Sequence, residues 1–365
     1  MINPRGAEFA ELLAGCAAGV KQWTQTDHDV LFTAASGMGA LEGVIANLLS
    51  PGEQALFCTM GLFGELWARV ADAFGVDVVR LNAPWGEAIE PAALADALDR
   101  HPGVRSVFLT HCETSTGVCN GAAQLATIVK ERGLLLALDS ISAAPGHPLA
   151  IDALGADAVM LASQKGWLAP PGLAMVAVSP AALQAAATAT CPRYYFDFAR
   201  QKAAQERGLT HTTPPLAAMY GLREGLAIMR AEGREALWAR QRAVGAAVRA
   251  GLEALGLTLV ATGGLPSETV TAVHSPFASP ARLDAFLAHL ERRHGIVLAE
   301  GIGELTGRAF RIGHLGTTSE DDIARLLERL RAALLDAGHL PPSPRSRPMY
   351  PPGCLQPSLG DVTAH

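Results

Sequence analysis

The chain has 365 residues, a formal net charge of −6 and a hydrophobic content of 49%, values typical of a globular protein with about two domains. Because the net charge is negative and Lys and Arg are scattered, we expect no nucleic-acid surface. The sequence has neither the run of ~20 apolar residues that a membrane helix needs nor a signal-peptide pattern, so we expect no membrane association.

Six cysteines are spread along the chain, and none of them forms a C-x-x-C pair. Several lie within apolar runs, where cysteine serves as a small hydrophobic residue. This usage is typical of a reducing compartment, so a cytoplasmic location is predicted. No metal site is predicted.

From about residue 29 onward, short apolar or β-branched runs alternate with longer helical patterns. This order predicts an α/β fold, with a mostly parallel seven-stranded sheet and crossover helices. The expected strands are residues 29–34, 55–59, 76–81, 105–110, 134–139, 157–162 and 173–178. The expected helices between them include residues 38–49, 62–74 and 122–132.

A long helical region, residues 216–255, follows the last of these strands. The pattern after it is strand, strand, helix, strand, strand, helix, which predicts a smaller α+β domain. We place the large domain at residues 1–235 and the small C-terminal domain at residues 236–338. Residues 339–365 are rich in proline and poor in periodic apolar residues, which predicts a mobile tail.

Lys165 is one of four lysines, and it follows an apolar predicted strand and precedes a Pro-Pro-Gly turn. The other three, Lys21, Lys130 and Lys202, lie among polar residues. Apolar neighbours lower the pKa of an ammonium group, which makes the amine available as a nucleophile or base. The alternative is a lysine whose stem lines the core while its head reaches water or a carboxylate.

Asp139 ends the most apolar of the predicted strands. Ligands of open parallel sheets bind beyond the carboxyl ends of the strands, so Asp139 and Lys165 are expected to face one crevice. A carboxylate in that position can hold a protonated ring nitrogen. Its alternative role is to cap the turn at residues 140–144.

Residues 33–39, with the sequence Thr-Ala-Ala-Ser-Gly-Met-Gly, join the first predicted strand to a helix. Free N–H groups and the helix dipole favour an anion at such a junction, and the Ser36 hydroxyl adds a donor. The spacing matches neither a dinucleotide-binding loop nor a P-loop, so a small phosphate ester is favoured. The alternative is that the glycines serve packing alone.

Arg311 lies between Phe310 and Ile312 on a predicted strand of the small domain. Its planar guanidinium can bind a carboxylate in a bidentate manner. The alternative is an interdomain salt bridge. His314, three residues further on, is predicted to be structural.

A phosphate-binding turn, an acid, a lysine and an arginine in this order suit pyridoxal phosphate (PLP) and an amino acid. Over about residues 5–338 the sequence resembles the class V aminotransferases of PLP fold type I, in their alanine or serine glyoxylate (pyruvate) aminotransferase branch. The motifs that carry this resemblance are Ser-Gly-Met-Gly-Ala-Leu-Glu at 36–42, Gly-Leu-Phe-Gly at 61–64, His-Cys-Glu-Thr-Ser-Thr-Gly at 111–117, Asp-Ser at 139–140, Ser-Gln-Lys-Gly at 163–166, Pro-Pro-Gly at 170–172, Thr-Pro-Pro at 213–215, Tyr-Gly-Leu-Arg-Glu at 220–224 and Arg-Ile-Gly-His-Leu-Gly at 311–316.

The resemblance implies that Lys165 forms a Schiff base with the cofactor and later transfers the proton, while Asp139 pairs with the pyridinium nitrogen. It also implies that Phe63 stacks on one face of the ring and Ile141 packs on the other. The remaining implied contacts are Thr114 near the ring hydroxyl, Ser36, Gly37, Met38 and Gln164 at the phosphate, Thr213 at the phosphate of the partner subunit, and Arg311 at the substrate carboxylate.

The activity that the resemblance implies is ping-pong transfer of the amino group of alanine or serine to a 2-oxo acid such as glyoxylate or pyruvate, in a homodimer with shared sites. Alternatives are a 2-aminoethylphosphonate or ureidoglycine aminotransferase, a PLP lyase of the cysteine desulfurase type, and an inactive cofactor-binding protein or non-enzymatic phosphate binder. Gln164 disfavours the desulfurases, in which a histidine precedes the lysine. The N-terminal part of the large domain is expected to be incomplete relative to the family, and Thr210 replaces a tyrosine of the related animal enzyme.

Overall fold

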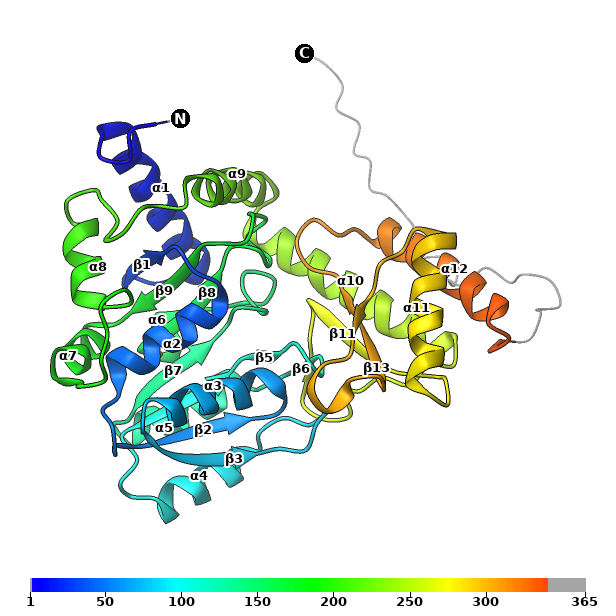
Figure 1. The fold of residues 1–365 in the computed structure, drawn as a ribbon, viewed down its shortest axis with the longest axis horizontal. Coiled ribbons are helices and arrows are strands. Elements are labelled where there is room, and N and C mark those ends of the chain that lie inside the picture. Colours follow the sequence, from blue (N-terminus) through cyan, green and yellow to red (C-terminus); the bar gives the residue numbers. More distant parts are fainter. Residues whose placement is uncertain (1, 341–365) are drawn as a thin grey trace.

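The computed structural model describes residues 2–340, which form a large α/β unit and a smaller unit beside it (Figure 1). The large unit opens with helix α1 (Ala7–Thr24), which was not among the predicted elements. Its apolar residues, including Phe9, Leu12 and Val20, are buried against the sheet. Within residues 2–340, no helix is both long and apolar enough to cross a bilayer.

The centre of the large unit is a seven-stranded sheet with the order β1-β9-β8-β7-β4-β2-β3. Its strands are β1 (Asp29–Thr33), β2 (Gln54–Thr59), β3 (Asp77–Asn82), β4 (Ser106–Thr110), β7 (Leu135–Asp139), β8 (Ala158–Ala162) and β9 (Ala174–Val178). Strand β9 runs antiparallel to both of its neighbours, so the other six strands share one direction. The predicted mostly parallel seven-stranded sheet is confirmed.

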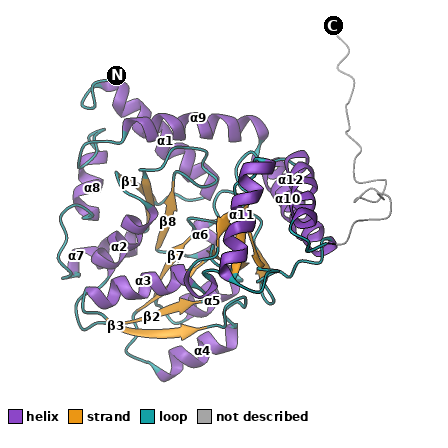
Figure 2. Ribbon diagram, turned by 45° about the vertical axis from the view of Figure 1, so that its right-hand side comes forward, coloured by secondary structure: helices purple, strands orange, loops and turns teal. Residues whose placement is uncertain are grey.

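Helices cover both faces of this sheet (Figure 2). The helices of the large unit that follow β1 are α2 (Gly37–Leu48), α3 (Leu62–Ala73), α4 (Pro91–Arg100), α5 (Ala122–Glu131), α6 (Ile151–Leu154), α7 (Pro180–Thr188) and α8 (Phe198–Gln205). One core lies under α1, α4 and α5, and the other under α2, α3 and α7. Because the central strands are buried on both faces, they read as continuous apolar runs rather than alternating ones.

Two long helices, α9 (Leu216–Glu232) and α10 (Arg234–Ala254), lead into the smaller unit. A three-stranded sheet with the order β11-β13-β12 packs there against α10, α11 and α12 around a third core. The remaining elements are β11 (Val270–His274), α11 (Pro280–His294), β12 (Ala299–Glu300), the 3₁₀ helix η1 (Gly303–Leu305), β13 (Ala309–Gly313) and α12 (Glu320–Asp336). This arrangement confirms the small α+β unit. The predicted boundary between residues 235 and 236 falls in the first turn of α10 and stays a prediction.

One strand that we expected in the small unit belongs elsewhere. Strand β10 (Leu265–Pro266) pairs with β6 (Val118–Cys119), which pairs with β5 (Cys112–Glu113) of the large unit. This small sheet therefore links the two units next to the carboxyl ends of the main strands. The predicted proline-rich tail, residues 339–365, lies outside the described residues from residue 341 onward.

Helix α9 supports the loop that follows Lys165. A Cβ atom on Gly225 would lie 2.2 Å from the carbonyl oxygen of Trp167, and one on Gly221 would lie 2.4 Å from Cδ of Pro170. Real Cβ atoms do not approach other atoms this closely, so the loop and the helix can touch only because both positions are glycine. The loop also contains Leu168, whose φ of 61° is rare for a residue with a side chain.

We predict that Gly225→Ala destabilises the protein, although alanine is the better helix former. The clash with the Trp167 carbonyl costs about 1–3 kcal/mol, which exceeds the gain of about 0.5–1 kcal/mol from helix propensity. The matched control is Gly15→Ala in α1, where no atom lies within 4 Å of the added Cβ. That variant should be as stable as the parent or more so. Urea denaturation followed by circular dichroism measures both, and equal effects would contradict the prediction.

Candidate active site

The predicted site residues that follow strands of the main sheet lie at one edge of it, because six strands share one direction. Strand β1 leads into residues 36–38, β2 into Phe63, and β4 into Thr114. Strand β7 ends at Asp139, and Lys165 follows β8, the neighbour of β7. The expected meeting of the acid and the lysine at neighbouring strand ends is confirmed by this topology.

Lys165 is half-buried, and its ammonium group has no hydrogen-bond or ion-pair partner among residues 2–340. The other lysines differ, because Lys130 pairs with Asp157 and Lys202 with Asp29, both at 2.6 Å. Burial lowers the pKa of Lys165, and the positive charge of Arg311 lowers it further. An amine without partners and with a lowered pKa is suited to act as a nucleophile or base.

Asp139 is buried, and its Oδ1 accepts a hydrogen bond from the Ile141 N–H at 2.9 Å. This contact supports the turn after β7, which was the alternative role for the residue. Burial raises the pKa of Asp139 to about 7, against the effect of the Ile141 donor and the nearby charge of Lys165. A buried carboxyl of this kind is stabilised as an anion by any cationic group placed against it.

The turn between β1 and α2 has the properties expected of an anion site. Ser36 is the N-cap residue of α2, but its side chain makes no capping hydrogen bond, so it leaves the first N–H groups of the helix to another acceptor. Gly37 is packed tightly, since a Cβ there would lie 2.8 Å from Cδ1 of Ile141. Met38 is exposed, and Oε1 of the Gln164 side chain is buried without a partner among residues 2–340.

Arg311 on β13 reaches the large unit. Its Nε donates to the Glu300 carbonyl at 2.9 Å, and one of its terminal nitrogens lies 3.5 Å from the Thr114 carbonyl oxygen. It forms no salt bridge among residues 2–340, and burial lowers its pKa. The Thr114 hydroxyl is hydrogen-bonded to the Ser142 hydroxyl. Arg311 therefore offers an unpaired, partly buried cation beside Lys165 and Thr114.

Three other sequence-predicted residues have different surroundings. Phe63 lies in the first turn of α3 and is half-buried. Thr213 is exposed in the segment before α9, and among residues 2–340 its side chain makes no hydrogen bond to the group around Lys165. His314 is buried, and its Nε2 lies 2.9 Å from the Thr271 hydroxyl, which fits the structural role predicted for it.

Sequence reasoning missed Glu113, a fully buried acid in the segment between β4 and the site. Its carboxylate accepts hydrogen bonds from the first turn of α3, which carries Phe63. The signal was present in the sequence, because a single acid lies among the small polar residues at 111–117 directly after an apolar strand.

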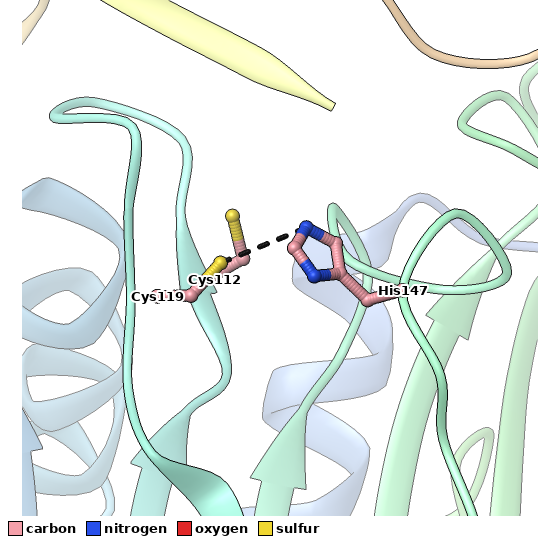
Figure 3. Close-up of side chains that lie close together, drawn as sticks. All are labelled: Cys112, Cys119 and His147. Atoms are coloured by element: carbon pink, nitrogen blue, oxygen red, sulfur yellow. Dashed lines mark hydrogen bonds between the residues drawn. The ribbon is translucent and has the colours of Figure 1, made fainter. Parts of the chain in front are cut away.

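A second group that the sequence did not reveal lies behind this segment. Cys112 and Cys119 face each other across the β5–β6 pair, and Cys119 Sγ lies 3.7 Å from His147 Nε2 (Figure 3). Each end of the group also has a partner within the fold. His147 Nε2 accepts the Glu268 N–H at 2.9 Å, and Cys112 Sγ donates to the Ser267 hydroxyl at 3.0 Å. These hydrogen bonds give Cys112, Cys119 and His147 a structural role in joining the neighbouring segments.

Comparisons with known proteins agree with the geometry. The family model "Aminotransferase class-V" matches residues 1–304. The chain is 37% identical over 341 residues to the soluble hydrogenase 42 kDa subunit of Anabaena cylindrica, covering 93% of this chain and 88% of that protein. It is 33% identical over 325 residues to the L-aspartate–glyoxylate aminotransferase of Paracoccus denitrificans, covering 87% and 82% of the two chains.

Among solved structures, the alanine–glyoxylate aminotransferase of a Nostoc species superposes with a TM-score of 0.85 at 28% identity, covering 91% of this chain and 89% of that one. The predicted family, the fold and pyridoxal phosphate as cofactor are thereby confirmed. The chain belongs to the class V aminotransferases, which are PLP-dependent transaminases.

Proposed function

We propose that this aminotransferase moves the amino group of a small amino acid, alanine or serine, to a 2-oxo acid such as glyoxylate or pyruvate by a ping-pong mechanism. The observation that carries the proposal is the Lys165 amine, which has no partner among residues 2–340, near the buried Asp139 carboxyl at the ends of adjacent strands. The names of the relatives from Nostoc and Paracoccus support glyoxylate as the acceptor.

The residues around Lys165 fit the cofactor. The uncapped start of α2, with Ser36, Gly37 and Met38, would hold the phosphate together with Gln164. Bound there, PLP would supply an aldehyde that reacts with amines and a ring that withdraws electrons. Phe63 and Ile141 would cover the two faces of that ring, and Thr114 would lie at its hydroxyl.

The protein's own groups have separate tasks in this proposal. Lys165 takes the proton from the substrate Cα and returns it, because its lowered pKa leaves part of the amine unprotonated. Asp139 keeps the ring nitrogen protonated through its negative charge. Arg311 binds the substrate carboxylate, since it has no salt-bridge partner among residues 2–340.

The amino donor distinguishes this proposal from its alternatives. An alternative aminotransferase of the same architecture would use ureidoglycine or 2-aminoethylphosphonate as its donor, and a desulfurase would release sulfide from cysteine. Gln164 before the lysine favours the transaminase over the desulfurase. We further propose that the enzyme is a cytoplasmic homodimer in which Thr213 reaches the phosphate of the partner subunit, because Thr213 is exposed in its own chain.

The first test uses purified protein loaded with PLP. Alanine or serine with glyoxylate or pyruvate should give measurable amino transfer, and Lys165→Ala should lower the rate at least ~10³-fold because it removes the proton-transfer group. Lys130→Ala is the control and should stay active. Borohydride treatment should attach the cofactor to Lys165, as read by peptide mapping. Label on another lysine, or faster turnover of aspartate, cysteine or ureidoglycine than of both proposed donors, would contradict the proposal.

A separate prediction concerns the pH dependence of stability without cofactor. Asp139 has a pKa of about 7 in the folded protein, against an ordinary value of 3.8. Between these values the folded protein binds more protons than the unfolded chain, so this group lowers stability as pH rises from about 4 to about 7. A shift of this size corresponds to at most about 4 kcal/mol.

The measurement is urea denaturation of the parent protein and of Asp139→Asn across that pH range. The stability of the parent relative to Asp139→Asn should fall as pH rises, and should level off above pH 7. The buried histidines His111, His147 and His314 have lowered pKa values and produce the opposite trend. Their effect is common to both proteins and cancels in the difference. A flat difference would show that Asp139 ionises normally, and a difference that rises with pH would show a lowered pKa; either result would contradict the prediction.

Mixing two variants tests the shared site. A Lys165→Ala subunit mixed with a Thr213→Val subunit forms mixed dimers in which one site carries both substitutions and the other carries neither. Activity should therefore rise above that of either parent variant after mixing. Thr213→Val alone should weaken PLP binding about 5- to 100-fold, the effect of one hydrogen bond to a charged acceptor. If mixed dimers form and no activity returns, Thr213 serves its own subunit.

A further inference from the structure

We infer that Glu113 is a positioning residue for the cofactor site, which fixes the Phe63 ring through the first turn of α3. The inference rests on the role proposed for Phe63 against the cofactor ring. It assigns a function to an acid that lies within the 111–117 motif but has no role in the proposed chemistry.

The Glu113 carboxylate is fully buried and accepts hydrogen bonds with both oxygens. Its Oε2 accepts the Phe63 N–H at 3.0 Å and the Gly64 N–H at 3.2 Å. Its Oε1 accepts the Ser115 N–H at 3.0 Å and the Ser115 hydroxyl at 2.6 Å. One oxygen therefore holds α3, and the other holds the segment that follows β4.

Helix α3 needs this acceptor because it has no side-chain cap of its own. The N-cap position is Gly61, which has no side chain to bind the free N–H groups of the first turn. No larger residue fits there, since a Cβ on Gly61 would lie 2.4 Å from the Ser115 hydroxyl and 2.5 Å from Cγ of Glu113. The carboxylate replaces the missing cap, and the positive end of the helix dipole favours its charge.

The placement of Glu113 connects this cap to the site. Its neighbour Thr114 is bonded through its hydroxyl to Ser142 and lies at 3.5 Å from Arg311. The three residues 113–115 thus hold the segments that carry Phe63, Ile141 and Arg311 in one cluster. Glu113 has no salt-bridge partner among residues 2–340. Burial raises its pKa, and the N–H and O–H donors of Ser115, Gly64 and Phe63 oppose this by stabilising the carboxylate. Burial of such a charge is costly unless the donors stay in place, which keeps the geometry narrow.

Glu113→Gln tests the inference because it keeps the shape and changes the hydrogen bonding. An amide has one acceptor oxygen and one NH₂ group. The NH₂ group would therefore face N–H donors, either those of the α3 turn or that of Ser115, where the carboxylate supplies an acceptor. Ser115→Ala is the matched control. It removes the hydroxyl that donates to Glu113 and accepts the Leu62 N–H at 3.1 Å, but it leaves both bonds from Glu113 to the Phe63 and Gly64 N–H groups.

The measurement is the Kd for PLP, from the change in absorbance on adding PLP to cofactor-free protein, for Glu113→Gln, Phe63→Ala, the double variant and Ser115→Ala. Glu113→Gln should raise the Kd about tenfold, and so should Phe63→Ala, with Ser115→Ala changing it about threefold or less. The double variant should be no more than about threefold weaker than Phe63→Ala, because Glu113 acts through the Phe63 turn. The visible circular dichroism of bound PLP should change in Glu113→Gln and remain in Ser115→Ala.

Two outcomes would overturn the inference. One is an unchanged Kd for PLP in Glu113→Gln. The other is a double variant that binds PLP about 100-fold more weakly than the parent, as expected for independent effects. If Glu113→Gln does not fold, Glu113→Asp, which keeps the charge on a shorter side chain, replaces it in the same comparison with the same criteria. Failure of the proposed function looks different, because the parent protein itself would then bind no PLP or would bind it away from Lys165.

Discussion

The common direction of six strands is the constraint on which the site depends. Parallel strands bring their carboxyl ends to one edge, and β1, β2, β4, β7 and β8 each lead into a segment of the site there. The reversed strand β9 does not disturb this arrangement, because it only separates β1 from β8. Ser36 and Lys165, which are more than 100 positions apart in the sequence, thereby lie at the same edge of the sheet although no hydrogen bond joins them.

The charged groups at this edge are arranged without mutual salt bridges. Lys165 and Arg311 each lack an acidic partner, and Asp139 and Glu113 each lack a basic one, among residues 2–340. Burial therefore raises the pKa of the two acids and lowers the pKa of Lys165 and Arg311, so it favours the neutral form of each group. Keeping these groups charged costs free energy when no ligand is bound. A ligand that carries a phosphate, a protonated ring nitrogen and a carboxylate would relieve this cost at several positions together.

The segments around these groups are closely packed at several glycines. Gly221 and Gly225 of α9 allow the loop after Lys165 to lie against the helix, and Gly61 allows Glu113 and Ser115 to approach the start of α3. Each contact would be blocked by a single methyl group. The small unit is held to the large one by β10 and by Arg311, so that its central strand β13 reaches the same edge.

The strands and the α/β class could be predicted from the sequence alone, because buried parallel strands are continuous apolar runs. The cofactor family followed from the resemblance of the motifs around Ser36, Asp139 and Lys165 to those of the class V aminotransferases. The sequence did not reveal α1, the pairing of β10 with β6, or the Cys112, Cys119 and His147 group, since these depend on contacts between distant segments. Only the tertiary structure showed that Glu113 caps α3, because a helix without its own cap can borrow an acceptor from any segment that packing brings near.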